Sequence, residues 1–235
     1  MKHFSFTCMI ILSTACSALP QKPNQNNSRQ FTENLMQESC TFASSGRNTY
    51  CILEPGYQME YEGMEGNDKV RLVITVTNET RKIGNVETRM VIEDESVNGN
   101  RIEISRNFFA YCKETGSIYY FGEEVDIYKD GKIVKHEGDW IAEGPNKAGV
   151  DVPGLPLIGA RFYQEMAPGA AMDRIEIQSL GETLETPAGT FTNCMKTEET
   201  TPLEPGEKEY KTYAPGVGLI QDETALLVKY GFVKL

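Results

Sequence analysis

The stretch from Leu184 to Gly231 is cut into short extended segments by three turns that combine proline and glycine. The turns are Pro187-Ala188-Gly189, Glu204-Pro205-Gly206 and Ala214-Pro215-Gly216. Proline fixes φ near the value that the first corner of a tight turn needs, and glycine supplies the positive φ of the next corner. Three consecutive antiparallel strands are therefore predicted, over residues 189–201, 208–214 and 218–230.

The same alternation of strand and turn runs through the residues before this stretch. Alternating or β-branched runs predict strands over residues 57–62, 70–77, 86–97, 101–113, 117–128, 132–136, 161–166 and 175–186. Asn98-Gly99 and Asp130-Gly131 are pairs that favour two-residue hairpins. No long amphipathic helix separates the strands, which excludes alternating β-α-β architecture. We expect an all-β fold, a curved antiparallel β-meander that forms an incomplete barrel or a sandwich.

Residues 142–159 interrupt this pattern with four glycines and three prolines. Such a density of turn-forming residues predicts a long irregular loop. The segments on either side of the loop do not each predict a self-sufficient sheet. We therefore expect a single β domain over residues 40–235.

The N-terminus has the pattern of a secretory signal peptide. Lys2 and His3 precede an apolar run from Phe4 to Leu12, which is too short for a permanent membrane-spanning helix. Residues 12–16, Leu-Ser-Thr-Ala-Cys, also resemble a bacterial lipoprotein box, which predicts lipidation of Cys16. Cleavage by ordinary signal peptidase after Ala15 or Ala18 is the alternative. We expect a signal peptide over residues 1–18 and a flexible tether over residues 19–39, with one short helix at 31–39.

Four cysteines lie beyond Cys16: Cys40, Cys51, Cys112 and Cys194. An even number suits two disulfides in an oxidising compartment. The closeness of Cys40 and Cys51 favours a local bridge, which leaves Cys112 to pair with Cys194. Four cysteines allow three pairings, however, and the sequence does not choose among them.

The formal net charge of the chain is −11. Nucleic-acid binding needs clusters of lysine and arginine that neutralise phosphates, so this class of partner is excluded. The same charge disfavours electrostatic docking on an anionic membrane. We expect contact with a membrane only through a lipid anchor.

Two neighbouring predicted strands are rich in aromatic residues. Alternation places Phe109 and Tyr111 on one face of the first strand, and Tyr119 and Phe121 on one face of the second. These four residues are candidates for the wall of a cavity that binds a lipid or another apolar ligand, as curved sheets and barrels can provide. Ordinary core packing is the alternative, because aromatic rings supply much of any protein core.

A group of carboxylates follows on the second of these strands. Glu124 and Asp126 share one face, and Asp130 lies at the hairpin turn. Together they form a candidate Ca²⁺ site, since this ion takes six to eight oxygen ligands, and a solvated strand face is the alternative. With His136 and Glu137 nearby, residues 123–137 also suggest a metal-assisted hydrolase. No GxSxG motif is present, and His136 is the one histidine beyond the signal peptide, so we assign no catalytic residue.

Five motifs together resemble a family of uncharacterised secreted bacterial proteins. They are LEPGY at residues 53–57, SRNFFA at 105–110, YFGEEVDIY at 120–128, QEMAPG at 164–169 and YAPGVGL at 213–219. The resemblance spans residues 53–231. It implies an exported protein whose closing strands are similar to the curved sheets of periplasmic lipoprotein carriers. It implies no catalytic or binding residue, because the family has no established activity.

These observations predict an exported, non-enzymatic protein of the bacterial cell envelope, without a cofactor. Its expected partner is an apolar small molecule or an envelope protein. The alternative function is the metal-assisted hydrolase with its site in residues 123–137.

Overall fold

The computed structural model describes residues 30–136 and 138–235. The signal peptide, the lipidation site Cys16 and Glu137 lie outside these residues. The strands are β1 (Phe42–Ala43), β2 (Gly46–Arg47), β3 (Ile52–Leu53), β4 (Tyr57–Glu65), β5 (Asp68–Ile83), β6 (Val86–Val97), β7 (Asn100–Cys112), β8 (Ile118–Lys129), β9 (Lys132–His136), β10 (Trp140–Ile141), β11 (Lys147–Val152), β12 (Arg161–Tyr163), β13 (Glu165–Met166), β14 (Arg174–Thr186), β15 (Gly189–Thr200), β16 (Glu209–Ala214), β17 (Gly218–Asp222) and β18 (Ala225–Phe232). One short 3-10 helix, η1, covers Gln37–Ser39.

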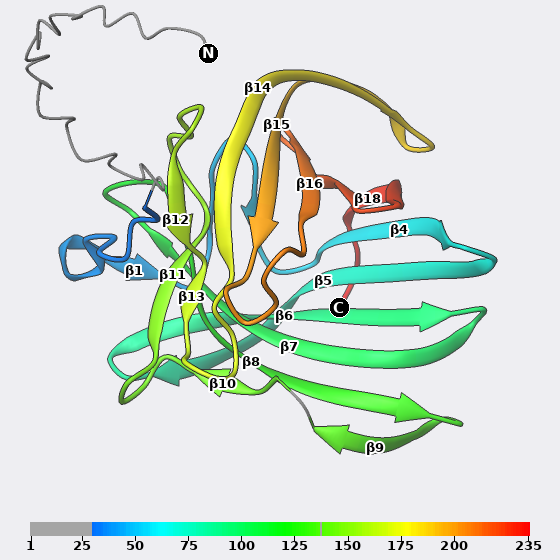
Figure 1. Cartoon of the computed structure of the whole chain (residues 1–235), viewed down its shortest axis with the longest axis horizontal. Helices are drawn as coiled ribbons and strands as arrows, with labels where there is room; N and C mark the ends of the chain where they lie inside the picture. The colour runs from blue at the N-terminus through cyan, green and yellow to red at the C-terminus, as the bar shows by residue number, and fades with distance from the viewer. Residues whose placement is uncertain (1–29, 137) are drawn as a thin grey trace, which may run out of the picture.

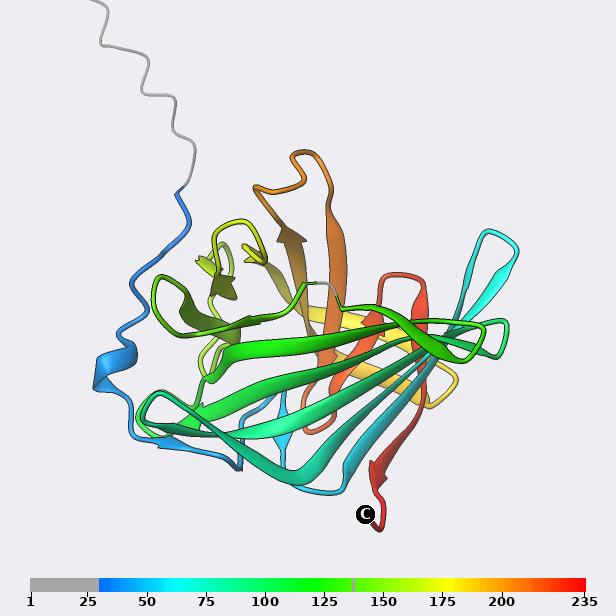
Figure 2. The same cartoon turned by 90° about the horizontal axis from the view of Figure 1, so that it is seen from below.

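Two antiparallel meanders make up most of the sheet. Each strand from β4 to β8 pairs with the next along the chain and forms the first meander, and β14 to β18 form the second meander in the same way. Figure 2 shows the long strands of the first meander as a fan, with the orange strands β15 and β16 rising on one side of it. The all-β class that the sequence predicts is confirmed.

The last strand of the second meander joins it to the first strand of the first. β18 pairs antiparallel with β4, from Leu226 opposite Glu62 to Phe232 opposite Tyr57. The hydroxyl group of Tyr57 donates a hydrogen bond to the carbonyl oxygen of Val217 (2.7 Å), and that of Tyr61 donates to the carbonyl oxygen of Leu219 (2.9 Å). These bonds tie β4 to the loop before β17 and to β17 itself, while the buried rings fill the core.

On its other side the sheet closes almost completely. β8 pairs with β11 and β11 with β13, whereas β12 pairs with β14. β12 and β13 are the two ends of the strand order, yet only Gln164 separates them in the chain. The result is a nearly closed sheet of 13 strands with one seam, between β12 and β13 (Figure 1). This matches the predicted incomplete barrel.

The core inside this sheet is one apolar cluster to which both meanders contribute. Among its buried members are Tyr61 and Ile74 from the first meander and Ile177, Met195 and Leu227 from the second. Alternation along each strand sends every second side chain to this interior. The closure of the sheet therefore buries both meanders at once.

The hairpin turns that the sequence predicts are confirmed. Asn98 and Gly99 have φ values of 51° and 80°, and Asp130 and Gly131 have values of 52° and 72°. Two successive positive φ values match the type I′ turn, whose twist suits a two-residue hairpin. Gly216 has a φ of 73° and follows Pro215, as a type II turn requires.

The single strand predicted over residues 218–230 is wrong, because the chain turns inside it. β17 ends at Asp222 and β18 begins at Ala225, and between them Glu223 adopts a φ of 50°. The turn contains neither glycine nor proline, so the sequence carries no signal for it. Conversely, β4 continues to Glu65, beyond the predicted strand of residues 57–62. A Cβ atom at Gly63 would lie 2.6 Å from the carbonyl oxygen of Thr224, so this glycine permits the close approach of that turn.

The irregular loop predicted over residues 142–159 contains a strand, β11. Its Gly149 faces the backbone of Tyr163 and Gln164 so closely that a Cβ atom would lie 2.3 Å from the carbonyl oxygen of Tyr163. Glycine is therefore needed for chain contact at this position rather than for a turn. Residues 153–159 do form an irregular loop, between β11 and β12.

Residues 30–39 lie on the body of the protein, which corrects this part of the predicted tether and the predicted helix at 31–39. Residues 19–29 of the tether lie outside the described residues. The guanidinium groups of Arg161 and Arg174 lie 4.1 and 4.4 Å from the centroid of the Phe31 ring. Thr32 forms a parallel bridge with Phe162. In the described part of the chain the only helical turn is η1, and Phe31, Thr32 and Leu35 instead contact neighbouring strands. No helix in the described residues is long and apolar enough to cross a membrane.

The predicted disulfide pairing is also wrong. Cys40 is bonded to Cys112, and Cys51 and Cys194 are free thiols. The cause is the pairing of β1 with the end of β7, where Phe42 lies opposite Cys112 and brings Cys40 alongside. The short distance in sequence favoured Cys51 as the partner of Cys40, but the pairing of strands determines which cysteines lie within bonding distance.

Arg89 stabilises a break in the ladder between β5 and β6. The register shifts between Val76 and Thr80, which leaves carbonyl groups of β5 without ladder partners. The buried Arg89 guanidinium donates to the carbonyl oxygens of Asn78 (2.9 Å) and of Thr77 and Glu79 (3.4 Å each), and its Nε donates to that of Ser44 (2.8 Å). Satisfied carbonyl groups permit the bend at low cost.

We predict that non-reducing peptide mapping will yield one linked peptide pair, containing Cys40 and Cys112, while Cys51 and Cys194 react with alkylating agents once the chain is unfolded. The double variant Cys40→Ser/Cys112→Ser should lose roughly 4 kcal/mol of unfolding free energy in urea, because the bridge closes a separation of 72 residues. A linked pair of Cys40 with Cys51, or of Cys112 with Cys194, would contradict the observed pairing.

We predict that Arg89→Met lowers the free energy of unfolding by about 2–3 kcal/mol, because several buried carbonyl groups lose their donor. Chemical denaturation measures the change. Arg71→Met is the matched control: Arg71 forms a partly exposed ion pair with Glu60 (2.9 Å), and its loss should cost less than about 1 kcal/mol. Equal losses for the two variants would show that Arg89 has no special role.

Candidate functional site

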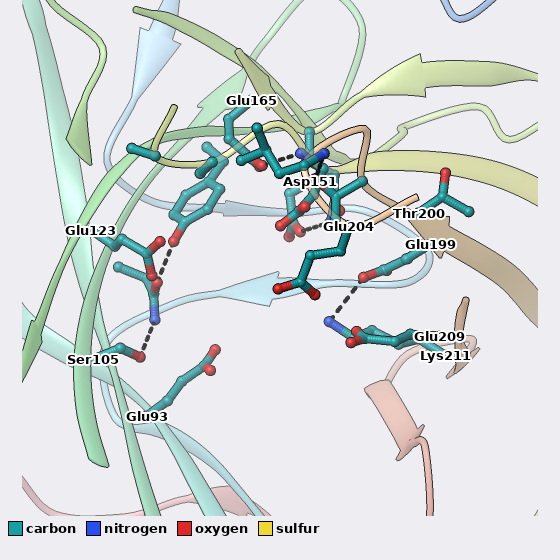
Figure 3. Close-up of a pocket in the computed structure, with 18 of the residues that line it drawn as sticks. Glu93, Ser105, Glu123, Asp151, Glu165, Glu199, Thr200, Glu204, Glu209 and Lys211 are labelled. Carbon is teal, nitrogen blue, oxygen red and sulfur yellow. Dashed lines mark hydrogen bonds and ion pairs between the residues drawn. The ribbon is translucent and has the colours of Figure 1, made fainter. Parts of the chain in front are cut away.

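A cavity of about 450 Å³ lies between the two meanders. Its wall consists mainly of polar side chains, of which Figure 3 draws most. The lining residues include Ser105, Asn107, Phe109, Tyr120, Gln164, Thr200, Thr201 and Leu203, together with ten carboxylates: Glu93, Glu103, Glu123, Asp151, Glu165, Asp173, Glu199, Glu204, Glu207 and Glu209. Lys211 is the one basic side chain among the described residues that line it.

Three parts of the fold supply these carboxylates. Glu93, Glu103 and Glu123 come from β6, β7 and β8 of the first meander, and Glu199 and Glu209 from β15 and β16 of the second. Asp151 and Glu165 come from β11 and β13, next to the seam. The site therefore exists only because the sheet curls until these three parts face one another.

Alternation explains how single strands contribute several lining residues. On β7, Glu103, Ser105, Asn107 and Phe109 are two residues apart and all reach the cavity. On the facing wall, Glu199 of β15 lies directly opposite Glu209 of β16 in the ladder. Like charges in such a cross-strand pair destabilise a sheet, which indicates that this arrangement serves something other than folding.

Glu199 and Lys211 form the only ion pair described within the cavity. Lys211 Nζ lies 3.0 Å from Glu199 Oε2. Glu199 is 6% exposed, and its second oxygen, Oε1, has no hydrogen-bond partner. Burial raises the pKa of Glu199 to about 7, although Lys211 acts to lower it. Burial alone would lower the pKa of Lys211, but the surrounding carboxylates, Asp222 and Glu199 foremost, raise it well above its usual value.

The opposite wall carries a hydrogen-bonded chain beside Glu123. The hydroxyl group of Tyr120 donates to Asn107 Oδ1 (2.6 Å), and Asn107 Nδ2 donates to Ser105 Oγ (3.0 Å). Phe109 stacks on Tyr120 with the ring centroids 4.8 Å apart. Burial raises the pKa of Glu123 to about 7. Burial likewise raises the pKa of Glu93 to about 8.

The carboxylates near the seam are held by neighbouring donors. Glu165 Oε1 accepts a hydrogen bond from the backbone N–H of Asp173 (2.5 Å), and Asp151 Oδ1 accepts one from Gln164 Nε2 (3.2 Å). Burial raises the pKa values of both Asp151 and Glu165. Figure 3 shows these groups and Glu199 directed toward a common space, with Glu204 reaching into it from the loop between β15 and β16.

This arrangement suits positive charge that is spread out rather than concentrated in one ion. The one group of three metal-ligand atoms within 4.8 Å among the described residues is Cys40, Cys112 and Glu114, and the two sulfur atoms there form the disulfide. The cavity carboxylates do not converge on a point in this way. A bare Ca²⁺ ion needs six to eight oxygens at 2.3–2.6 Å. Several separate cationic groups would match the carboxylates better.

The structure separates the four aromatic residues that the sequence proposes as a ligand wall. Phe109 lines the cavity, together with Tyr120, which the sequence analysis did not select. Tyr119 and Phe121 lie on the other face and pack against Phe42, with centroid distances of 5.3 and 5.2 Å. The ring of Tyr111 packs over Gly46.

The three carboxylates of the predicted metal site each have a different environment. Asp126 forms an ion pair with Arg106 (2.9 Å), and its Oδ1 lies 2.8 Å from His136 Nδ1. Glu124 pairs with Arg81 at 2.5 Å, and Asp130 lies in the hairpin turn. None of them lines the cavity. Their neighbour Glu123 does, because adjacent residues of a strand point to opposite faces.

The sequence predicts the strands that carry the acidic wall, but not that these strands face one another. Glu93, Glu103, Glu123, Glu199 and Glu209 all lie in predicted strands, at positions where an alternating strand would place its inward residues if the fold were known. The density of carboxylates along the chain favoured residues 123–130 as a site, whereas the cavity is lined by single carboxylates from several strands.

Comparisons with protein-family models, with curated proteins and with solved structures find no match to this chain.

The raised pKa values predict that stability falls as pH rises from about 5 to about 8. A carboxyl group whose pKa is higher in the folded than in the unfolded protein binds more protons when folded, so its stabilising effect is complete at low pH and is lost as pH passes the folded pKa. For Glu93 the window lies between the usual value of 4.5 and about 8.

The variant Glu93→Gln should therefore be more stable than the native protein at pH 8, by about 1–2 kcal/mol, and gain little at pH 5. Urea denaturation at both pH values measures the difference. Glu185→Gln, at an exposed position of β14, is the control and should show no such pH dependence. A gain for Glu93→Gln that is equal at both pH values would contradict the raised pKa.

Proposed function

We propose that this protein is an exported, non-enzymatic binding protein that holds a small organic cation with several amino groups in the cavity between its meanders. The observation that carries this proposal is the imbalance of charge: ten carboxylates and one lysine line the cavity, and a buried oxygen of Glu199 has no partner. A buried carboxylate oxygen without a donor costs free energy, and an ammonium group would supply that donor.

The size and wall of the cavity support an organic cation. A volume of about 450 Å³ falls in the range of small-molecule sites. The stacked rings of Phe109 and Tyr120 offer an apolar surface to methylene groups and attract ammonium groups to their faces. Carboxylates on opposite walls, such as Glu123 and Glu199, would each take a separate amino group of one elongated ligand.

The acidic wall favours this ligand over the apolar one that the aromatic strands predict. A lipid chain would leave the carboxylates desolvated and without donors. Of the four predicted aromatic residues only Phe109 lines the cavity.

Export to the bacterial envelope is part of the same proposal. Its support is the signal pattern at the N-terminus, the lipoprotein-like Cys16 and the disulfide between Cys40 and Cys112, a bond that persists in oxidising compartments. A location outside the cytoplasm would give the protein a role in capturing or presenting external amines.

Titration calorimetry with spermidine, at pH 7 and low salt, tests the proposal. We expect saturable binding to one site, with roughly one to two protons released per ligand, because the amine favours the ionised form of Glu93, Glu123 and Glu199. Titrations in two buffers of different ionisation enthalpy give the proton count. The variant Glu199→Gln should bind at least about tenfold more weakly.

Three controls sharpen this test. Glu185→Gln changes an exposed carboxylate outside the cavity and should bind as the native protein does. Lys211→Gln removes the competing internal cation and should bind spermidine more tightly. A neutral diol of similar length should not bind. Binding of Ca²⁺ without binding of spermidine, or equal affinity for the diol, would overturn the proposal.

A further inference from the structure

The loop between β11 and β12 exposes three large aliphatic side chains. Leu155, Leu157 and Ile158 are 78%, 63% and 68% exposed. In Figure 1 this loop projects beyond the ends of both strands. The run from Val152 to Ala160 contains no charged residue, although the chain as a whole carries a net charge of −11. An uncharged apolar tip on an acidic protein marks an interaction surface.

The loop is held in place at both ends, so its exposure is built into the fold. At its start, the backbone N–H of Gly154 donates to Ser117 Oγ (3.1 Å), and a Cβ atom on Gly154 would lie 2.0 Å from the carbonyl oxygen of Thr115. At its end, the N–H of Gly159 donates to the carbonyl oxygen of Ile177 (2.8 Å). A turn bond of 2.9 Å from the N–H of Ala160 to the carbonyl oxygen of Leu157 fixes the tip.

The direction of the N-terminal chain relates this loop to the predicted lipid anchor. Thr32 pairs with Phe162 in a parallel bridge, with hydrogen bonds from Thr32 N to Arg161 O (2.8 Å) and from Tyr163 N to Thr32 O (3.3 Å). In a parallel pair both chains run the same way. The chain that precedes Thr32 therefore lies on the same side as the chain that precedes Phe162, which includes Ile158. The segment that joins the body to Cys16 starts at the rim that carries the apolar loop.

We propose that Leu155, Leu157 and Ile158 insert into the interfacial region of the lipid bilayer that anchors the protein through Cys16. Apolar side chains that enter the bilayer beside a lipid anchor add buried apolar area and so strengthen membrane binding. The net charge of −11 disfavours electrostatic attraction to anionic lipid, so apolar insertion is the contribution that fits this loop.

Fluorescence of a tryptophan placed in the loop tests this insertion. The full chain carrying Leu157→Trp is mixed with phosphatidylcholine vesicles whose acyl chains are brominated, which quenches only indoles that enter the bilayer. The native Trp140 is 4% exposed and supplies a constant background. Val134→Trp, at a 59% exposed position of β9, is the matched control. We expect quenching and a blue shift for Leu157→Trp, and neither for Val134→Trp nor for the native chain.

Vesicle flotation of a second pair of variants measures the contribution to binding. Leu155→Ser/Ile158→Ser should lower the partition coefficient of the full chain by at least about tenfold. Ile133→Ser/Val134→Ser removes two comparably exposed aliphatic side chains from β9 and should change it less than about twofold. Adding anionic lipid should weaken binding of all forms.

The inference is overturned if Leu157→Trp is not quenched or if the loop variant floats with vesicles as well as the native chain does. A change in oligomeric state of the loop variant in analytical ultracentrifugation, with vesicle binding unchanged, would also overturn it and assign the loop to contacts between protein chains.

Discussion

The pairing of β18 with β4 is the interaction on which the rest of the structure depends. More than forty residues separate the two meanders in the chain, and this ladder joins them into one curved sheet. The hydroxyl groups of Tyr57 and Tyr61 stabilise the junction by donating hydrogen bonds to the carbonyl oxygens of Val217 and Leu219. Contacts between such distant parts of a chain cost loop-closure entropy, which must be offset by burial on both sides of the new interior. The apolar cluster shared by the two meanders supplies that burial.

Closure also produces the acidic cavity, which opposes folding. Once β15 and β16 face β6 to β8, Glu199 and Glu209 share a space with Glu93 and Glu123, and burial raises the pKa of Glu93 to about 8 and those of Glu123 and Glu199 to about 7. A sequence selected for stability alone would place neutral side chains there. Groups that oppose stability and gather around one cavity are typical of a functional site, because ligand binding can offset their cost.

The sequence predicts those features that depend on neighbours in the chain. Asn98-Gly99 and Asp130-Gly131 specify their hairpins because both residues of each pair readily adopt positive φ. Glu223 also adopts positive φ, although no glycine or proline marks its turn, because the chain must turn there for β18 to pair with β4. The disulfide partner of Cys40 and the acidic wall depend on which strands meet, and no local pattern contains that information. Glu124 and Asp126 looked like a site because they are close in sequence, yet they pair with Arg81 and with Arg106 and His136.

The segment at the seam connects closure with the site. Within residues 161–166, β12 pairs with β14 whereas β13 pairs with β11, so the ladder is interrupted there. Side chains that also line the cavity add hydrogen bonds at this break. Glu165 accepts one from the backbone N–H of Asp173, and Gln164 donates one to Asp151. These carboxylates therefore belong both to the wall of the site and to the closure of the sheet. Under the proposed function, a cation that neutralises Asp151 and Glu165 would relieve repulsion at the seam. Binding would then stabilise the closed sheet, as any ligand selective for the folded state must.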